Sequence, residues 1–240
     1  MKKSIFLTLI MALLAISLTS AQDLDEILDN YFETIGQESL AKVKTIKATG
    51  KAVIMGMDAP FKMISKRPDK IRITIDFQGA EIVQAYDGET AWMINPMNGS
   101  PEAIDMTGPE ADGLIESGDM DGQLWNWEEK GHQLELEGTE EVDGTEAFVL
   151  KLTKKNGNMD YYYIDAEGYL VIKIKSITLM NGSEMEAETL LSNYQDVGGY
   201  ITPYTIEQRV GGQTAMNLML DEVTYDVEVD DAIFSKPGSN

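Results

Sequence analysis

The stretch from Ser65 to Pro96 restricts the possible folds more than any other part of the chain. Four apolar residues in it alternate with polar ones: Ile71, Ile73, Ile75 and Phe77. This two-residue period is typical of a strand with one buried face, whereas a helix would scatter the same residues around its axis. The pattern breaks at Gln78-Gly79, resumes over residues 80–86 and reverses at Asp87-Gly88, a pair that suits a type I′ turn. The stretch therefore predicts three consecutive antiparallel strands, a β-meander.

Most of the chain after Thr45 continues this pattern. Short alternating segments are separated by glycine-containing turn pairs: Asp143-Gly144, Asn156-Gly157, Glu167-Gly168, Asn181-Gly182, Gly198-Gly199 and Gly211-Gly212. We expect roughly ten to twelve strands joined by connections of hairpin length. Because a parallel crossover needs a much longer connection, the spacing favours an antiparallel arrangement throughout.

Residues 23–43 form the one convincing helical segment before these strands. Its apolar residues recur at intervals of three and four: Leu24, Ile27, Leu28, Tyr31 and Ile35. Gly36 is expected to end the helix. A long meander cannot remain flat because strand twist accumulates, so we expect it to curl around this helix. The predicted fold class is mainly β with α: a strongly curved antiparallel sheet, an incomplete β-barrel, that wraps an N-terminal helix and carries a short helical lid.

Residues 97–129 interrupt the strand pattern. They are rich in glycine, proline and acidic residues, with short apolar groups such as Leu114-Ile115 and the pair Trp125 and Trp127. A connection of this length in a compact domain is usually functional, and short helices over the mouth of an open barrel would bury its apolar residues. We predict a lid-like insertion over residues 97–129.

Residues 1–21 have the pattern of a signal peptide. Lys2 and Lys3 precede an apolar run over residues 5–16, and small residues at 19–21 suit cleavage before Gln22. We expect export to the periplasm and a single mature domain over residues 22–240; the alternative is a retained membrane anchor, for which the apolar run is short. The chain has no cysteine. This excludes an acylated N-terminal cysteine, disulfides, thiolate catalysis and cysteine-bound metals.

The charge balance makes nucleic acid and anionic membrane surfaces poor partners. The chain has 41 acidic and 19 basic residues, a formal net charge of −22, which repels phosphate at long range. Acidic clusters lie at residues 119–122 and 226–231, but neither completes a calcium-binding loop pattern. We interpret both as solvated faces, with weak incidental calcium binding as the alternative, and we expect no cofactor, no resident metal and no stable membrane insertion.

Familiar catalytic motifs are missing from the sequence. The single histidine, His132, has no G-x-S-x-G partner motif, and the sequence contains no P-loop, G-x-G-x-x-G or H-E-x-x-H pattern. We predict that the protein is not an enzyme. A hydrolase using a pair of carboxylates, with Asp119 and Asp121 as the obvious candidates, is the weakest of three functional hypotheses.

The same central stretch carries a family resemblance. Lys66-Arg67-Pro68 precedes a strand, and Asp87-Gly88, Thr90, Trp92 and Asn95-Pro96 follow in order. This resembles the segment K-R-P … D-G-x-T-x-W-x-x-N-P of the bacterial outer-membrane lipoprotein-sorting proteins, the LolA/LolB-like superfamily. Outside Ser65 to Pro96 the likeness is one of layout. The resemblance implies a half β-barrel, a lid after Asn-Pro, and an arginine, here Arg67, that holds the lid closed by hydrogen bonds.

Our leading hypothesis is a monomeric, non-catalytic periplasmic protein that binds an acyl chain, lipid or lipoprotein anchor, with lipoprotein sorting to the outer membrane as its implied role. Flexible methionines suit ligands of variable shape, although they fill ordinary cores equally well. The expected cavity lining is Met55, Met63, Ile73, Ile75, Phe77, Met93, Trp125 and Trp127. The alternative is an envelope sensor or protein-interaction module on the same fold, whose partners are other envelope proteins.

Overall fold

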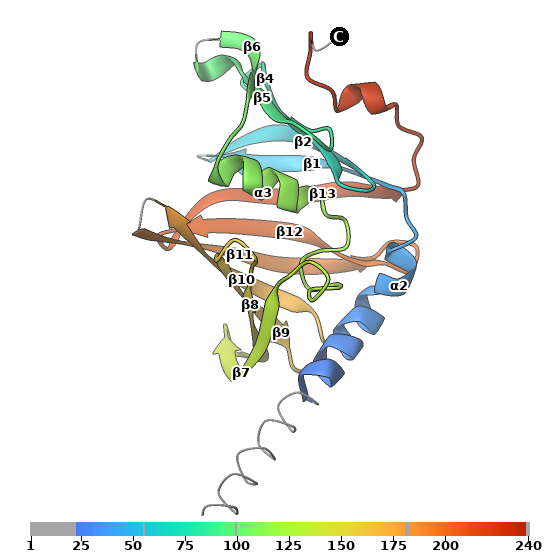
Figure 1. The fold of residues 1–240 in the computed structure, drawn as a ribbon, viewed down its shortest axis with the longest axis vertical. Helices are drawn as coiled ribbons and strands as arrows, with labels where there is room; N and C mark the ends of the chain where they lie inside the picture. The colour runs from blue at the N-terminus through green and yellow to red at the C-terminus, as the bar shows by residue number, and fades with distance from the viewer. Residues whose placement is uncertain (1–22, 55, 99, 181–182, 239–240) are drawn as a thin grey trace, which may run out of the picture.

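The computed structural model describes residues 23–54, 56–98, 100–180 and 183–238. These residues form one antiparallel sheet of thirteen strands, with β6 and β7 at its two edges. The sheet is strongly curved and does not close (Figure 1). The predicted fold class, an incomplete barrel built around an N-terminal helix, is confirmed. The predicted signal peptide, residues 1–21, and the predicted lining residue Met55 lie outside the described residues.

Two meanders make up the sheet. The first consists of β1 (Thr45–Ile54), β2 (Met57–Lys66), β3 (Lys70–Phe77), β4 (Ala80–Tyr86), β5 (Ala91–Asn95) and β6 (Ser100–Asp105). The second consists of β7 (Gln133–Val142), β8 (Thr145–Thr153), β9 (Met159–Asp165), β10 (Val171–Met180), β11 (Ser183–Asp196), β12 (Ile201–Val210) and β13 (Gln213–Tyr225). The last strand pairs with β1 and so joins the two meanders.

The register confirms the meander expected in the central stretch. Met63 on β2 lies directly opposite Ile73 on β3, and Ile75 lies opposite Ile82 on β4. Since residues opposite each other in a ladder point to the same face, the alternating apolar residues of β3 share one face with those of its neighbours. That face is the concave one.

Strand β6 corrects the predicted boundaries of the insertion. The interruption predicted over residues 97–129 in fact contains this strand, preceded by the 3₁₀ turn η1 (Pro96–Asn98). Pro101 conceals the strand in the sequence, yet an edge strand tolerates proline because one side of it has no ladder partner. The non-sheet part is therefore residues 106–132, which join β6 to β7 and which we call the connecting segment. It contains α3 (Pro109–Gly118).

Helices cover two separate parts of the concave face. Residues 23–35 are helical, and Leu24, Ile27 and Leu28 pack on the buried side chains of β7 to β10. Gly36 ends this helix with a φ of 74° before the short α2 (Gln37–Leu40), as predicted. Helix α3 lies instead against β3 to β5, where Leu114 packs in one cluster with buried Ile71. Within the described ranges, no helix has the length and apolar character needed to cross a membrane.

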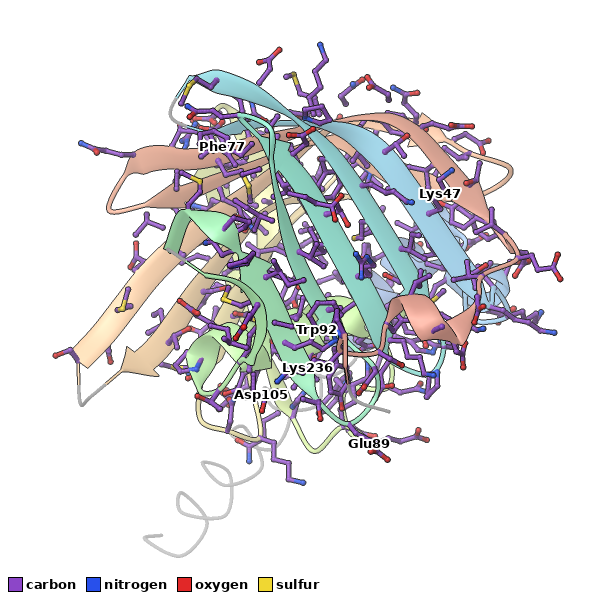
Figure 2. The ribbon with its side chains drawn as sticks, turned by 90° about the horizontal axis from the view of Figure 1, so that it is seen from above. Lys47, Phe77, Glu89, Trp92, Asp105 and Lys236 are labelled. Carbon is purple, nitrogen blue, oxygen red and sulfur yellow. The ribbon has the colours of Figure 1, made fainter. Side chains whose placement is uncertain are left out.

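The C-terminal segment crosses the convex face of the first meander. After β13 the chain forms η2 (Asp231–Ile233), and Phe234 is fully buried. Trp92 Nε1 donates a hydrogen bond to the carbonyl of Phe234 at 2.7 Å. Lys236 pairs with Asp105 at 2.8 Å (Figure 2). Trp92 of the D-G-x-T-x-W motif therefore stabilises the outside of the barrel and does not face its interior.

Candidate functional site

A cavity of about 540 Å³ lies on the concave side of the sheet. Its volume falls within the range of roughly 300–1,000 Å³ that small-molecule sites usually have. One wall consists of strands on both sides of the junction between the two meanders. The apolar residues of this wall are Ile46, Ala48, Met63, Ile206, Leu220 and Val223. The helical N-terminal region contributes Tyr31 and Ile35, and the connecting segment covers the cavity with residues around α3 and 119–124.

Apolar surface continues from this cavity along the concave face. A cluster with Phe61 and Phe77 buried at its centre is flanked by partly exposed side chains: Ile54, Met63, Ile73, Ile75, Ile82, Met216, Leu218 and Leu220. Met63 and Leu220 belong both to this cluster and to the cavity wall. The cavity and the cluster therefore form one continuous surface. We call the part formed by the cluster the apolar trough.

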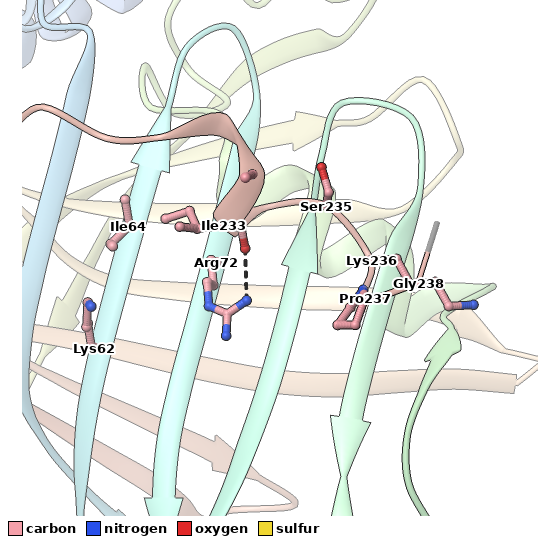
Figure 3. A pocket seen from close by; sticks show the side chains of 9 residues that line it. Lys62, Ile64, Arg72, Ile233, Ser235, Lys236, Pro237 and Gly238 are labelled. Atoms are coloured by element: carbon pink, nitrogen blue, oxygen red, sulfur yellow. Dashed lines mark hydrogen bonds between the residues drawn. The ribbon is translucent and has the colours of Figure 1, made fainter. Parts of the chain in front are cut away.

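A second hollow of similar volume, about 610 Å³, lies on the convex face beneath the C-terminal segment (Figure 3). It is lined by Lys62, Ile64 and Arg72 and by residues 232, 233 and 235–238. Arg72 donates a hydrogen bond there to the carbonyl of Ile233 at 2.8 Å. This hollow is the space between the sheet and the C-terminal segment that is bonded across it. Because the C-terminal segment itself occupies this face, we place the candidate site in the concave cavity.

The predicted lining residues that belong to described strands are distributed over three places. Met63 lies in the cavity wall, and Ile73, Ile75 and Phe77 lie in the trough. Met93 packs in the cluster beneath α3.

The two predicted tryptophans lie elsewhere. Trp125 packs edge to face on Phe32, with ring centroids 4.9 Å apart, and Trp127 packs against the core between the helix and β7 to β10. Neither lines the cavity. Tryptophans at lid-like positions looked suited to a ligand, but their large apolar rings here anchor the connecting segment to the N-terminal helix and the core.

Arg67 joins three parts of the chain at the edge of the cavity. Its guanidinium binds Asp121 of the connecting segment through two hydrogen bonds, Nη1 to Oδ2 at 2.5 Å and Nη2 to Oδ1 at 2.6 Å. It also donates to the carbonyls of Val43 and Leu40, at 2.6 and 3.1 Å. Such bidentate, charge-assisted bonds are stronger than neutral ones and fix geometry. The hydrogen bonds that Arg67 donates to Asp121 raise the pKa of its guanidinium above the usual value.

A second set of bonds fixes the turn after α3. Lys130 Nζ binds Asp119 Oδ2 at 2.5 Å and the carbonyl of Gly122 at 2.6 Å. His132 Nδ1 accepts a bond from the backbone N–H of Lys155, so its Nε2 carries the proton and donates to Gln123 Oε1 at 3.1 Å. Burial lowers the pKa of His132, which favours this neutral form. The single histidine of the chain thus positions a loop.

A buried ion group also lines the cavity. Lys154 Nζ bridges Asp160 Oδ2 at 2.8 Å and Glu116 Oε2 of α3 at 2.6 Å. The lysine and aspartate side chains are only 9% and 6% exposed. Burial lowers the pKa of Lys154, but the two carboxylates more than compensate and leave the pKa above its usual value. Sequence reasoning missed this group because its members come from three separate elements.

The cavity offers surface for binding a ligand, and its candidate catalytic carboxylates are already paired with cations. Asp119 and Asp121, the candidate catalytic pair, are each engaged by a cation, Lys130 and Arg67. Among the residues that the structure describes, no group of three or more His, Asp or Glu side chains could hold a metal ion.

No protein-family model and no curated protein matches the sequence. Solved structures do match. A DUF1329 family protein from Desulfovibrio piger has a TM-score of 0.61 at 15% identity, covering 87% of this chain and 97% of that one. A putative outer membrane lipoprotein-sorting protein domain from Vibrio parahaemolyticus has a TM-score of 0.58 at 14% identity, with coverages of 84% and 95%.

A LolA superfamily protein from Nitrosomonas europaea has a TM-score of 0.57 at 15% identity, with coverages of 88% and 97%. At these identities the likeness is one of fold. It agrees with the family resemblance of the stretch from Lys66 to Pro96, which predicted a half-barrel with an N-terminal helix. The chain therefore has a LolA-like fold.

Proposed function

We propose that this protein is an exported, non-catalytic carrier that binds the acyl chain of a lipid or of a lipid-modified protein on the concave face of its sheet. The observation that carries the proposal is the cavity whose wall shares Met63 and Leu220 with the apolar trough. Two structures of similar fold, described as a putative outer membrane lipoprotein-sorting domain and a LolA superfamily protein, also support a lipid-binding role. The predicted signal peptide supports an envelope location.

The energetics are sufficient without any catalytic group. Each methylene moved from water into an apolar site contributes roughly 0.8 kcal/mol. About ten buried methylenes therefore contribute about 8 kcal/mol, which corresponds to a dissociation constant near the micromolar range. The partly exposed side chains of the trough lose water contact in the same event.

The connecting segment acts as the lid in this proposal. It is held to the sheet by the Arg67–Asp121 pair and by the Lys154–Glu116 pair. Both links consist of polar bonds that water can replace, whereas the apolar contact of α3 involves few buried side chains, chiefly Ala111 and Leu114. Opening at α3 would uncover the cavity while the thirteen strands stay paired.

Titration of the delipidated mature chain with decyl and dodecyl amphiphiles by calorimetry tests the proposal. We expect saturable binding that Ile75→Asp weakens at least tenfold, because the charge is placed in the trough. Thr74→Asp is the matched control, since it changes the neighbouring residue of β3 on the opposite face. Equal loss in both variants, or no binding to any amphiphile by the unmodified chain, would reject the carrier and favour the interaction module.

A further inference from the structure

The walls of the cavity differ in chemistry. The wall formed by β1, β2 and β13 is apolar. On the other side, β9 to β11 and the adjoining turn place the polar side chains of Lys154, Asp160, Ser176 and Thr189 among apolar ones such as Ile174 and Leu191. Asp160 and Ser176 lie directly opposite each other across β9 and β10. An amphiphile with its tail along the trough would therefore bring its head to these polar side chains.

Asp160 is the unusual member of this wall. The residue is 5% exposed, and one carboxylate oxygen, Oδ2, is bonded to Lys154 at 2.8 Å. Its other oxygen, Oδ1, is buried and has no hydrogen-bond partner. Lys154 also bonds to Glu116. Buried polar atoms are nearly always satisfied in native proteins, so an unpaired carboxylate oxygen in a cavity wall requires an explanation.

The local charge indicates what kind of group can supply the missing bond. Four carboxylates line the cavity, from Glu116, Asp119, Asp121 and Asp160. Three cations pair with them: Lys130, Arg67 and Lys154. One negative charge remains in excess. An anionic head placed beside Asp160 would meet like charge with little water to screen it, whereas a donor would complete the carboxylate.

We propose that this cavity selects amphiphiles with an uncharged head that donates hydrogen bonds, such as the hydroxyls of an acylated glycerol, and that Asp160 Oδ1 accepts one of these bonds. Anionic heads are selected against. The tail occupies the apolar trough. This inference rests on the proposed carrier function and adds the chemical class of the head group to it.

Three probes with one tail test the inference: 1-monodecanoylglycerol, methyl decanoate and decanoate, each measured by displacement of a fluorescent acyl probe from the delipidated chain. The first carries hydroxyl donors, the second carries none and the third is an anion. We expect monodecanoylglycerol to bind about tenfold more tightly than either of the others, the effect of one hydrogen bond to a charged acceptor.

The variant Asp160→Asn tests whether Asp160 causes the preference for monodecanoylglycerol. Asparagine has nearly the same shape and removes the charge, so the advantage of monodecanoylglycerol should shrink to about twofold and decanoate should gain affinity. Asp58→Asn is the control, because Asp58 pairs with Lys51 at the surface, 63% exposed, away from the cavity. It should leave all three affinities unchanged.

The outcomes separate the two proposals. Equal binding of the three probes, or tighter binding of decanoate, overturns the inference about the head group while the carrier function stands. Failure of every probe to bind overturns both. The comparison of the three probes on the unmodified chain tests the head-group preference even if Asp160→Asn does not fold.

Discussion

Arg67 and Asp121 face each other through two hydrogen bonds, and this pair fastens the connecting segment to the corner between β2 and β3. Both side chains are largely shielded from water, at 24% and 18% exposure. The guanidinium also holds the carbonyls of Val43 and Leu40. One side chain therefore sets the relative positions of the N-terminal helical region, the sheet and the connecting segment.

Removing this pair should loosen the connecting segment. In Arg67→Leu, Asp121 loses its charged partner and keeps only the weaker bond from Gln37, and the carbonyls of Val43 and Leu40 lose the guanidinium. We expect this loss to lower the free energy of local opening by about 1–3 kcal/mol. Amide hydrogen exchange over residues 109–124 should then accelerate roughly tenfold or more, and release of a bound amphiphile should accelerate with it.

Arg209→Leu is the control for this effect. Arg209 also makes two bonds to a carboxylate, that of Glu207 on the same strand, but far from the connecting segment. It should leave exchange over residues 109–124 unchanged. If exchange over residues 109–124 is also unchanged in Arg67→Leu, Arg67 does not hold the connecting segment in place.

Helix α3 offers a second test, based on two glycines. A Cβ added at Gly118 would lie 2.3 Å from the carbonyl oxygen of Asp69, whereas one added at Gly113 would meet nothing within 4 Å. Gly118→Ala should therefore displace the end of α3 from the sheet, and Gly113→Ala should stabilise the helix by about 0.5–1 kcal/mol.

Urea unfolding and hydrogen exchange measure both effects. Gly118→Ala should lower the unfolding midpoint and raise exchange within α3, and Gly113→Ala should do neither. Equal behaviour of the two variants would show that α3 does not pack closely against the corner between β2 and β3.

The pH dependence of stability should carry a contribution from Tyr31, which lines the cavity. Burial raises the pKa of its hydroxyl from 10.0 to about 12. A folded-state pKa above the unfolded one stabilises the fold below pH 10, and this contribution is lost as pH rises from about 10 to about 12.

Urea unfolding at several pH values over this range tests the contribution of Tyr31. The stability of the unmodified chain should fall, and Tyr31→Phe should flatten the slope, because phenylalanine has no proton to lose. Ultraviolet absorbance of the phenolate reports the ionisation directly. An identical slope in both proteins would mean that Tyr31 is solvated in the fold.

Local patterns in the sequence were enough to predict the meander and the N-terminal helix. The alternation around Ile73 and the turn pair Asp87-Gly88 depend only on neighbours in the chain, and so does the stripe ending at Ile35. Strand β6 escaped prediction because it is short and contains Pro101. Its place as an edge strand, where proline is tolerated, is a property of the sheet and not of the segment.

The cavity wall depends on contacts that no local pattern encodes. Alternation tells which residues share a face, but the junction of β1 with β13 brings together residues far apart in the sequence, such as Ala48 and Val223, which are 175 positions apart. Asp160 stands between Met159 and Tyr161 in the sequence, where nothing marks it as buried, and Lys154 has the pattern of an ordinary turn lysine. The hairpin between β8 and β9 brings Lys154 close to Asp160, and Glu116 joins them only because α3 folds back over the concave face.

The most direct test of the carrier function is native mass spectrometry of the full chain purified from cell-envelope extract, with chemical identification of whatever dissociates. We expect one acylated molecule per chain, with lower occupancy in Ile75→Asp than in Thr74→Asp. Only bare protein, both from the extract and after incubation with acylglycerols and lipopeptides, would contradict it.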